Sequence, residues 1–278
     1  MATNTVAGRA DQMGRKTVRS TWFRWLLRAG LVTRGVMYLL VGWLAVQIGL
    51  GHGGEEADRA GALRAVAERP GGTLALWLLI VGFAGLALWG YTEALYGQAS
   101  PDGRKARKRL SSLGRGLIYT AGFAATIAFV VGHGSRSSDA QSQTFTARAM
   151  GEPGGRWLVL GVGIAFVAVG VGVIVHAVRR KFQAELEHIG PRVRPVVDVL
   201  GVVGHVARGL VMGGAGVLLS YAAVSFDPHK AQGVDGTLRE FARTPVGPWL
   251  LVAVAVGLLL FGLFSFCEAR WRKLEHLG

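Results

Sequence analysis

The sequence predicts an all-α integral membrane protein, a six-helix bundle made of three repeated transmembrane helical hairpins. Three observations predict this fold class. Hydrophobic residues make up 51% of the 278 residues and charged residues only 17%, whereas soluble domains carry about 25% charged residues. Six apolar stretches are separated by polar segments, and most are long enough to cross about 30 Å of hydrocarbon as a helix. These stretches also pair into a motif that occurs three times along the chain.

The six apolar stretches supply the predicted spans. They are Leu31–Leu50, Leu74–Leu95, Leu117–Val131, Trp157–Val178, Leu210–Phe226 and Trp249–Phe266. The third stretch is the shortest, and it lengthens if Ser111 and Arg115 are included at its start. A helix satisfies its own backbone hydrogen bonds in lipid, so each stretch is expected to form one transmembrane helix.

Short motifs before the spans recur in three copies. An Arg-Gly pair stands at or just before the start of each odd-numbered span, at Arg34, Arg115 and Arg208. Pro-Gly-Gly or Pro-Val-Gly-Pro precedes each even-numbered span, beginning at Pro70, Pro153 and Pro245. The separations from Arg to Pro are 36, 38 and 37 residues, and a polar residue follows each Pro by 23 positions. The chain therefore divides into a basic N-terminal segment, 1–28, and three hairpin repeats, 29–98, 110–182 and 199–274.

These motifs resemble a known family. The start Arg-Gly-hydrophobic-hydrophobic-Tyr at 34–38 and 115–119, the Pro-Gly-Gly punctuation and the threefold hairpin are similar to the bacterial membrane family catalogued as domain of unknown function 1206. The third copy departs from the pattern at Met212 and Val246, and the second has His176 where the others have Glu. The resemblance covers roughly residues 27–274 and implies a six-helix bacterial membrane protein, without supplying an activity or catalytic residues.

The charged residues divide unevenly between the two ends of the predicted spans. The segments on the side of the N-terminus, 1–35, 93–116, 176–209 and 267–278, hold 22 Lys and Arg against 8 Asp and Glu. The loops on the other side hold 9 of each. Because short loops rich in Lys and Arg stay in the cytoplasm, we expect a multi-pass protein of the bacterial plasma membrane with both termini cytoplasmic. The net charge of +14 then belongs to the cytoplasmic face.

The basic face is expected to meet anionic lipid headgroups. In segment 1–28 apolar residues recur at helical spacing while arginines lie largely off that stripe; the two sets are Val18, Trp22, Trp25 and Leu26, and Arg15, Arg19 and Arg28. A basic amphipathic helix suits the headgroup layer, and an extended start of the first span fits the same residues. The basic run 104–109 is routine for a membrane loop, so nucleic acid is not expected as a partner. A homo-oligomer is left open.

Each loop on the outer side carries a short segment with apolar spacing before its Pro. The apolar pairs are Leu63 with Val66, Phe145 with Ala149, and Leu238 with Phe241. An aspartate precedes each pair (Asp58, Asp139 and Asp235), and aspartate is favoured at or near helix N-termini. We expect three short helices on the outer surface, each leading into the next span, in preference to a lid.

The candidate functional set consists of ionisable residues inside or at the margin of the spans: Arg34, Arg115, Arg208, Glu93, His176 and Glu268. Such residues are costly in lipid and are functional candidates by default. Each Arg is expected to begin an odd-numbered helix and each Glu or His to end an even-numbered one, which predicts Arg–Glu pairs within the first and third hairpins. His176 is no anion for Arg115, so a hydrogen bond or a carboxylate from a neighbouring repeat is expected there. A structural or lipid-anchoring role is favoured over a proton or ion pathway.

Other patterns carry less chemistry. Gly209 and Gly213 match a small-xxx-small motif for close helix packing. His176 and His205 are the one pair suited to bis-histidine haem, without a repeated His pattern to support it. With Cys267 as the single cysteine there is no thiolate cluster, and the sequence contains no GxSxG, HExxH or P-loop motif. No catalytic residue, metal or cofactor is predicted.

Three function hypotheses remain. The first is a non-enzymatic bacterial plasma-membrane protein, a scaffold or lipid-interacting element. The second is a small-solute or ion transporter or channel along a glycine-lined, pseudo-threefold axis between the repeats, although three parallel repeats do not match the inverted two-repeat plan common in transporters. The third is a haem-binding membrane redox protein. The first two are best separated by whether the axis is a polar cavity or is closed by packed side chains.

Overall fold

The structure is a computed structural model, and it describes residues 21–51, 56–97, 105–132, 137–187, 189–242 and 247–272. Within these ranges the long helices are α2 (Thr21–Gly49), α4 (Gly72–Tyr96), α5 (Ala106–Val130), α7 (Gly155–Val178), α8 (Arg194–Ser225) and α10 (Gly247–Trp271). All six contain a stretch long and apolar enough to cross a membrane. The predicted fold class, an all-α membrane bundle, is confirmed.

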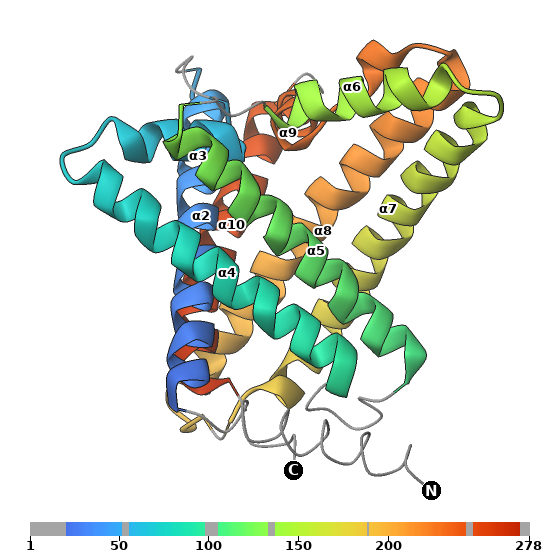
Figure 1. The fold of residues 1–278 in the computed structure, drawn as a ribbon. Helices are drawn as coiled ribbons and strands as arrows, with labels where there is room; N and C mark the ends of the chain where they lie inside the picture. The colour runs from blue at the N-terminus through green and yellow to red at the C-terminus, as the bar shows by residue number, and fades with distance from the viewer. Residues whose placement is uncertain are drawn as a thin grey trace, which may run out of the picture.

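Short helices lie together at one end of the bundle (Figure 1). They are α3 (Arg59–Ala67), α6 (Ser138–Met150) and α9 (Val234–Ala242), with the 3₁₀ turn η2 (Pro228–Lys230) beside them. The predicted short helix before each Pro is therefore confirmed. We call this the short-helix end. The opposite end, where α2 begins and α10 finishes, also holds the 3₁₀ turn η1 (Lys181–Glu185), and we call it the terminal end.

The Pro-Gly-Gly motif makes the turn from a short helix into the next span. Gly71 and Gly154 take the left-handed conformation, both with φ of 80°, which a residue without a Cβ adopts freely. The following glycine starts the long helix against the end of the short one. A Cβ at Gly72 would lie 2.3 Å from the Val66 carbonyl oxygen. The motif thus allows a close approach of two backbones.

The first long helix of each repeat begins earlier than predicted. Arg34, Arg115 and Arg208 lie 13, 9 and 14 residues after the first residues of α2, α5 and α8, so the expectation that each Arg begins its helix is wrong. A glycine lies within four residues before each Arg (Gly30, Gly114 and Gly204), and each helix continues through it, as an isolated glycine allows. Residues 21–28 are the first two turns of α2, continuous with the span, whereas residues 1–20, including Arg15, Val18 and Arg19, lie outside the described residues.

The most extensive helix contacts join different repeats. The first helix of each repeat (α2, α5 or α8) packs on the second helix of the preceding repeat in cyclic order (α10, α4 or α7, respectively). Within a repeat, α2 also packs on α4 and α8 on α10, but α5 and α7 form no packed interface among the described residues. The threefold order is kept between repeats, and the second hairpin is open.

Glycines at the helix crossings explain the open hairpin. In the first repeat, a Cβ at Gly82 would lie 2.6 Å from the Thr33 Cβ, and in the third, a Cβ at Gly204 would lie 2.6 Å from the Phe261 Cα. Counted from the repeated Arg and Pro, Ser111 and Ala165 take the places of these glycines in the second repeat, and both are exposed. A side chain at these positions blocks the close crossing that the other two hairpins make.

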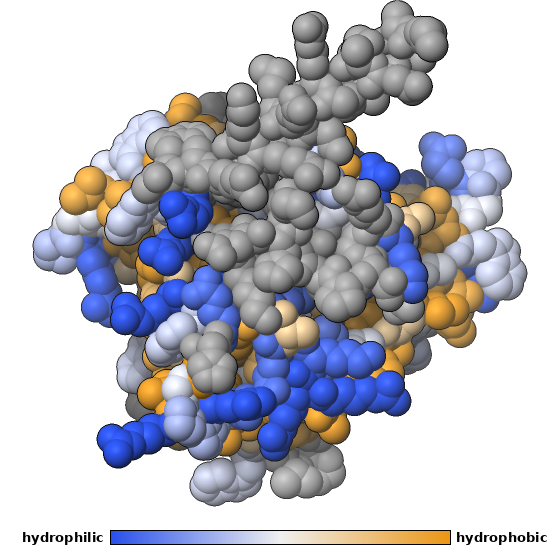
Figure 2. Space-filling view, turned by 90° about the horizontal axis from the view of Figure 1, so that it is seen from below, coloured by the Kyte–Doolittle hydropathy of each residue, from blue (hydrophilic) through white to orange (hydrophobic). Residues whose placement is uncertain are grey.

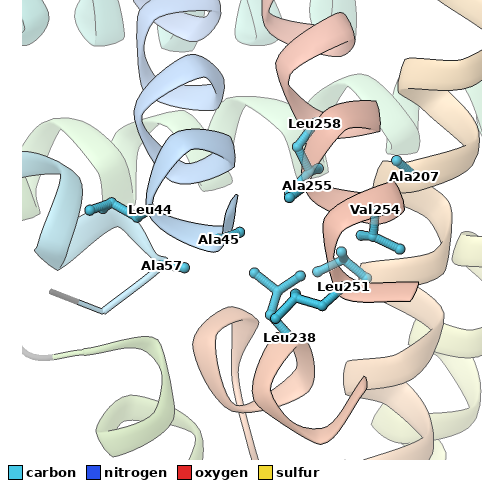
Figure 3. Packing of buried hydrophobic residues seen from close by; sticks show 10 residues of the cluster. Leu44, Ala45, Ala57, Ala207, Leu238, Leu251, Val254, Ala255 and Leu258 are labelled. Atoms are coloured by element: carbon cyan, nitrogen blue, oxygen red, sulfur yellow. The ribbon is translucent and has the colours of Figure 1, made fainter. Parts of the chain in front are cut away.

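Apolar side chains fill the region where the first and third repeats meet. Leu44 and Ala45 of α2 pack with residues of α8, α9 and α10 and with Ala57 (Figure 3). Leu251, Ala255 and Leu258 in this cluster are 0–2% exposed. Leucine and alanine, with valine, therefore fill the space between these two repeats, and no glycine is among the described residues of this cluster.

Replacing Gly204 by Ala tests the crossing of α8 and α10. The added methyl group would meet the Phe261 backbone, so we expect a loss of about 1–3 kcal/mol in stability from overpacking. Gly161→Ala on α7 is the matched control, because nothing lies within 4 Å of a Cβ there and alanine favours the helix. Thermal unfolding in detergent measures both, and equal midpoints for the two variants would refute this account of the crossing.

Candidate functional site

A buried ion-pair network joins α2, α10 and η1 at the terminal end. Arg34 of α2 donates to the Glu268 carboxylate of α10, and its Nε donates to Ser265 Oγ at 3.1 Å. Arg272 also donates to Glu268 and, through its other Nη, to Glu185 at 2.9 Å. Arg34, Glu268 and Arg272 are each less than 10% exposed. Two positive and two negative charges thus balance in a chain of hydrogen bonds that is buried except at Glu185, whose side chain is 35% exposed.

A second pair joins α5 to α4. Arg115 Nη2 lies 2.5 Å from Glu93 Oε2, and Ser112 Oγ donates to the same carboxylate oxygen at 3.0 Å. Glu93 is buried, whereas 30% of the Arg115 side chain is exposed. The buried carboxylate therefore receives two hydrogen bonds, and its arginine retains access to the surroundings of the protein.

One tryptophan connects the two ion pairs. The Trp89 ring, which is buried on α4, has Arg272 Cζ 4.2 Å and Arg115 Cζ 5.0 Å from its centroid. Cations over an indole face are attracted by its electron density, most strongly when water is excluded. The two ion pairs are therefore continuous through an aromatic side chain.

The third arginine has a different environment. Arg208 lies 5.3 Å from the Phe261 ring centroid and forms no ion pair with a described carboxylate. In the cyclic order its partner position is His176, whose charged neighbours are instead Glu185, Lys181 and Lys108. The contact of α7 with α8 relies on small residues, since a Cβ at Gly170 would lie 2.7 Å from the Gly209 oxygen and the Gly213 nitrogen. Glycine packing is present where the Arg–Glu pair is missing.

The arginine partners differ from the prediction. Pairing of Arg34 with Glu93 and of Arg208 with Glu268, within hairpins, is wrong, because Arg34 pairs with Glu268 of the third repeat. For Arg115, the alternative of a carboxylate from a neighbouring repeat is the one that the structure adopts. Each Arg-Gly motif contacts the preceding repeat, so the two ion pairs hold repeats together and do not set the register of one hairpin.

The geometry does not fit the bis-histidine haem hypothesis. His205 stacks on Phe182 at 5.6 Å with an interplanar angle of 9°. The rings of Phe261 and Phe264 lie 4.9 and 5.2 Å from it, edge-on. The His205 Nδ1 is 2.7 Å from the Gly201 carbonyl oxygen. A ring enclosed by three phenylalanines leaves no slot for a macrocycle, and His205 is better described as part of the aromatic core.

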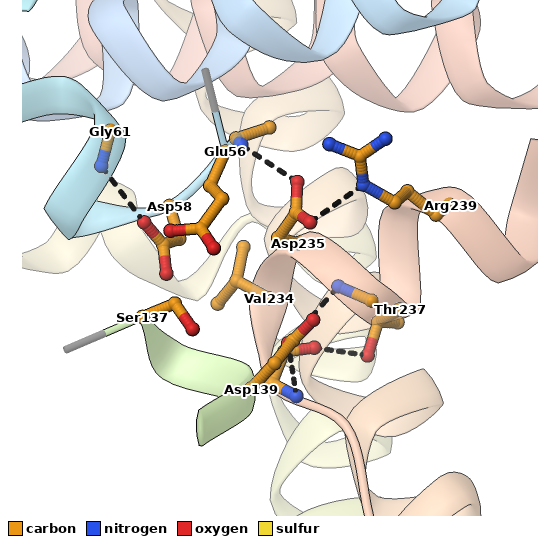
Figure 4. A network of polar contacts seen from close by, with 12 residues as sticks. Glu56, Asp58, Gly61, Ser137, Asp139, Val234, Asp235, Thr237 and Arg239 are labelled. Carbon is orange, nitrogen blue, oxygen red and sulfur yellow. Dashed lines mark hydrogen bonds and ion pairs between the residues drawn. The ribbon is translucent and has the colours of Figure 1, made fainter. Parts of the chain in front are cut away.

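A second polar network closes the short-helix end (Figure 4). Asp58, the N-cap of α3, accepts from the Ser138 N–H at 2.6 Å; Asp139 accepts from the Gly233 N–H at 2.7 Å; and Asp235 accepts from the Ala57 N–H at 2.8 Å. Each aspartate thus accepts a hydrogen bond from the backbone N–H group one or two residues before the aspartate of the next repeat. The three hydrogen bonds form a cycle. We call these residues the aspartate ring.

The aspartate ring brings three carboxylates close together, which costs electrostatic energy. Burial raises the pKa of Asp139, and the charges of Asp235 and Asp58 raise it further, against the lowering effect of the Gly236 and Gly233 N–H groups. Asp58 and Asp139 were predicted only as caps or first-turn acids of their own helices, and this role is confirmed. Their hydrogen bonds to the next repeat were not predicted, because nothing in the local sequence marks the partner backbone.

The comparisons with known proteins agree with the repeated architecture. The family model named Domain of Unknown Function (DUF1206) matches residues 29–97, 110–180 and 203–272. The chain belongs to this family. The Uncharacterized protein YxxB of Bacillus subtilis (strain 168) is 26% identical over 258 residues, which cover 91% of this chain and 92% of that protein. No solved structure matches.

The DUF1206 match confirms the resemblance seen in the sequence, and each matched range falls within one of the three predicted hairpins. In two of the three units of this chain the Arg reaches a glutamate of the preceding unit in cyclic order, whereas Arg208 of the third unit lies over Phe261 of its own unit.

Replacement of the two glutamates by glutamine tests the role of the ion pairs. Glu268→Gln leaves the buried Arg34 without an anion and Arg272 with Glu185 alone, so we expect a loss of about 3–5 kcal/mol and a low yield of folded protein. Glu93→Gln is the milder, matched change, because the partly exposed Arg115 reaches a polar environment. Thermal midpoints in detergent and membrane abundance measure both. Folded Glu268→Gln protein with altered ion flux in proteoliposomes would instead favour a proton or ion pathway.

Proposed function

We propose that this protein is a non-enzymatic scaffold of the bacterial plasma membrane that interacts with anionic lipids through a cytoplasmic terminal end. The observation that carries the proposal is the charge asymmetry: 22 Lys and Arg against 8 Asp and Glu on the terminal side, and 9 of each on the other. Lys and Arg close to an anionic leaflet contribute about 1 kcal/mol each.

The exposure of the basic residues supports this proposal. Figure 2 looks onto the terminal end, where hydrophilic side chains gather around the described helix ends. In the connection from α7 to α8, basic side chains are exposed at Arg179, Arg180, Lys181, Arg192 and Arg194. The buried arginines of the bundle are paired, so the exposed ones supply the attraction for headgroups.

Packing of the bundle disfavours the transporter hypothesis. The region between the first and third repeats is closed by the apolar cluster of Figure 3, and the charges of the Arg34–Glu268–Arg272–Glu185 network balance one another. Ion-pathway residues are expected to line a cavity or a relay with water access. The role that fits a balanced, buried network is to hold the repeats together.

Cysteine labelling tests the orientation. In a Cys267→Ser background, Glu152→Cys places a thiol in the exposed turn before α7 at the short-helix end, and Arg192→Cys places one in the exposed α7–α8 connection. A membrane-impermeant maleimide should label the first variant in intact bacteria and the second only after lysis. The reverse pattern would refute a cytoplasmic terminal end.

The lipid content of the purified protein tests the interaction. Protein extracted in mild detergent should retain anionic lipid in excess over its share of the host membrane, and the excess should fall as ionic strength rises. Lipid analysis by mass spectrometry after washes at low and high salt measures this. Retention that mirrors the bulk membrane at every salt concentration would refute a preference for anionic lipid.

A further inference from the structure

A groove at the terminal end combines basic and apolar residues. It has a volume of about 660 Å³, within the range usual for sites that bind small molecules. One wall is a face of α8 that includes Asp198, Val199 and Val203, and the other is the α7–α8 connection with Arg180 and Ile189. Arg194 stands at the start of α8 beside both walls.

The groove carries more positive than negative charge. Arg180 lies 3.6 Å from Asp198, whose other carboxylate oxygen accepts from Gln183 at 2.5 Å. Arg194 donates to the neutral Gln183 side chain at 3.2 Å and pairs with no described carboxylate. The groove therefore holds two arginines and one aspartate, and 62% of the Arg180 side chain is exposed. The excess charge is accessible to an anion.

The apolar wall belongs to α8, and Arg194–Ser225 is apolar and long enough to cross a membrane. Arg208 is the repeat equivalent of Arg34 and Arg115, whose ion pairs lie near the C-terminal ends of α10 and α4. Its position on α8 is therefore taken as the same level of the bundle. Val203 and Val199 are 5 and 9 residues nearer the terminal end, or about 8 and 14 Å along a helix that rises 1.5 Å per residue. Val199 is 58% exposed, so an apolar surface continues from the span toward the two arginines.

Arg180 holds its position despite an unfavourable backbone. It follows the end of α7 with φ of 51° and ψ of 29°, a left-handed conformation that glycine or asparagine usually supplies at a helix end. An arginine there costs conformational energy that a glycine would not. Such an outlier indicates that the side chain itself has a use at this point in the fold.

We propose that this groove is a specific binding site for one anionic phospholipid. The phosphate lies between Arg180 and Arg194, and an acyl chain runs along Val199 and Val203. This inference rests on the proposed attraction of the terminal end for anionic lipid and adds to it a defined site and stoichiometry. Guanidinium groups match phosphate through paired hydrogen bonds, and the valine wall excludes a free, fully hydrated phosphate as the favoured ligand.

Native mass spectrometry of the full-length protein, titrated with phosphatidylglycerol or phosphatidylcholine, tests the site. Wild-type protein should bind one phosphatidylglycerol on the order of tenfold more tightly than further copies, and this preference should be absent for phosphatidylcholine. Millimolar inorganic phosphate should not displace the bound lipid. Displacement by phosphate would overturn the acyl-chain part of the proposal.

Paired variants separate the groove from general surface charge. Arg180→Gly and Arg194→Gln should each lower the affinity for the first phosphatidylglycerol about tenfold. Arg179→Gln and Arg192→Gln remove exposed charges outside the groove and should leave this affinity unchanged. Arg180→Gly relieves the left-handed arginine, so its thermal midpoint should be unchanged or raised, which excludes misfolding as the cause of lost binding. Val199→Trp should fill the groove, with Val196→Trp, equally exposed at 59% but outside it, as control.

The outcomes distinguish this inference from the proposed function. If the groove variants and their controls lower anionic-lipid binding equally, the attraction is diffuse and the site is overturned, while the proposed function stands. If wild-type protein shows no preference for phosphatidylglycerol over phosphatidylcholine, both fail.

Discussion

The contact between the first long helix of each repeat and the second long helix of the preceding repeat is the interaction on which the bundle depends. At this contact the glycine of the Arg-Gly motif allows the helices to approach, and the arginine beside it reaches the acid on the neighbouring helix, as Gly35 and Arg34 do toward Gly262 and Glu268. In lipid no hydrophobic force drives helices together, so close backbone packing and buried polar contacts must supply the association. The aspartate ring repeats the same cyclic connection at the other end of the molecule.

Local features of the molecule could be predicted from the sequence, and its partnerships could not. The spans, the repeat and the short helices follow from the length of the apolar stretches, the Pro-Gly-Gly motifs and the aspartate before each short helix. Each of these signals is formed by residues that are close together in the chain. The partner of Arg34 depends on which helix comes close, and Glu93 and Glu268 occupy equivalent places in their repeats. The glycines that decide this point are too numerous, 42 in all, to be assigned to contacts without a structure. The left-handed Arg180 carries no sequence signal, because arginine is not a residue expected there.

Departures from the repeat concentrate around the second hairpin. Ser111 and Ala165 replace the glycines of a crossing, and His176 replaces a glutamate, so this side loses both the close approach of α5 and α7 and one of the three ion pairs. The interface of α7 with α8 keeps the glycine packing of the other two interfaces, with Gly170 and Gly209 in backbone contact. This packing is present without a buried ion pair, since Arg208 is the one repeated arginine that forms no ion pair with a described carboxylate.

This asymmetry also affects the exposed arginines of the α7–α8 connection. The α7–α8 connection joins two helices that pack along their length and therefore sit firmly relative to one another, while α7 is free of α5 on its other side. Exposed arginines on such a connection are held at fixed positions by rigid elements, which favours a defined anion geometry over a mobile basic tail. Buried arginines within the bundle hold the repeats together, and exposed arginines at its margin are the ones proposed to meet anionic headgroups. One residue type thus serves two roles, and burial decides between them.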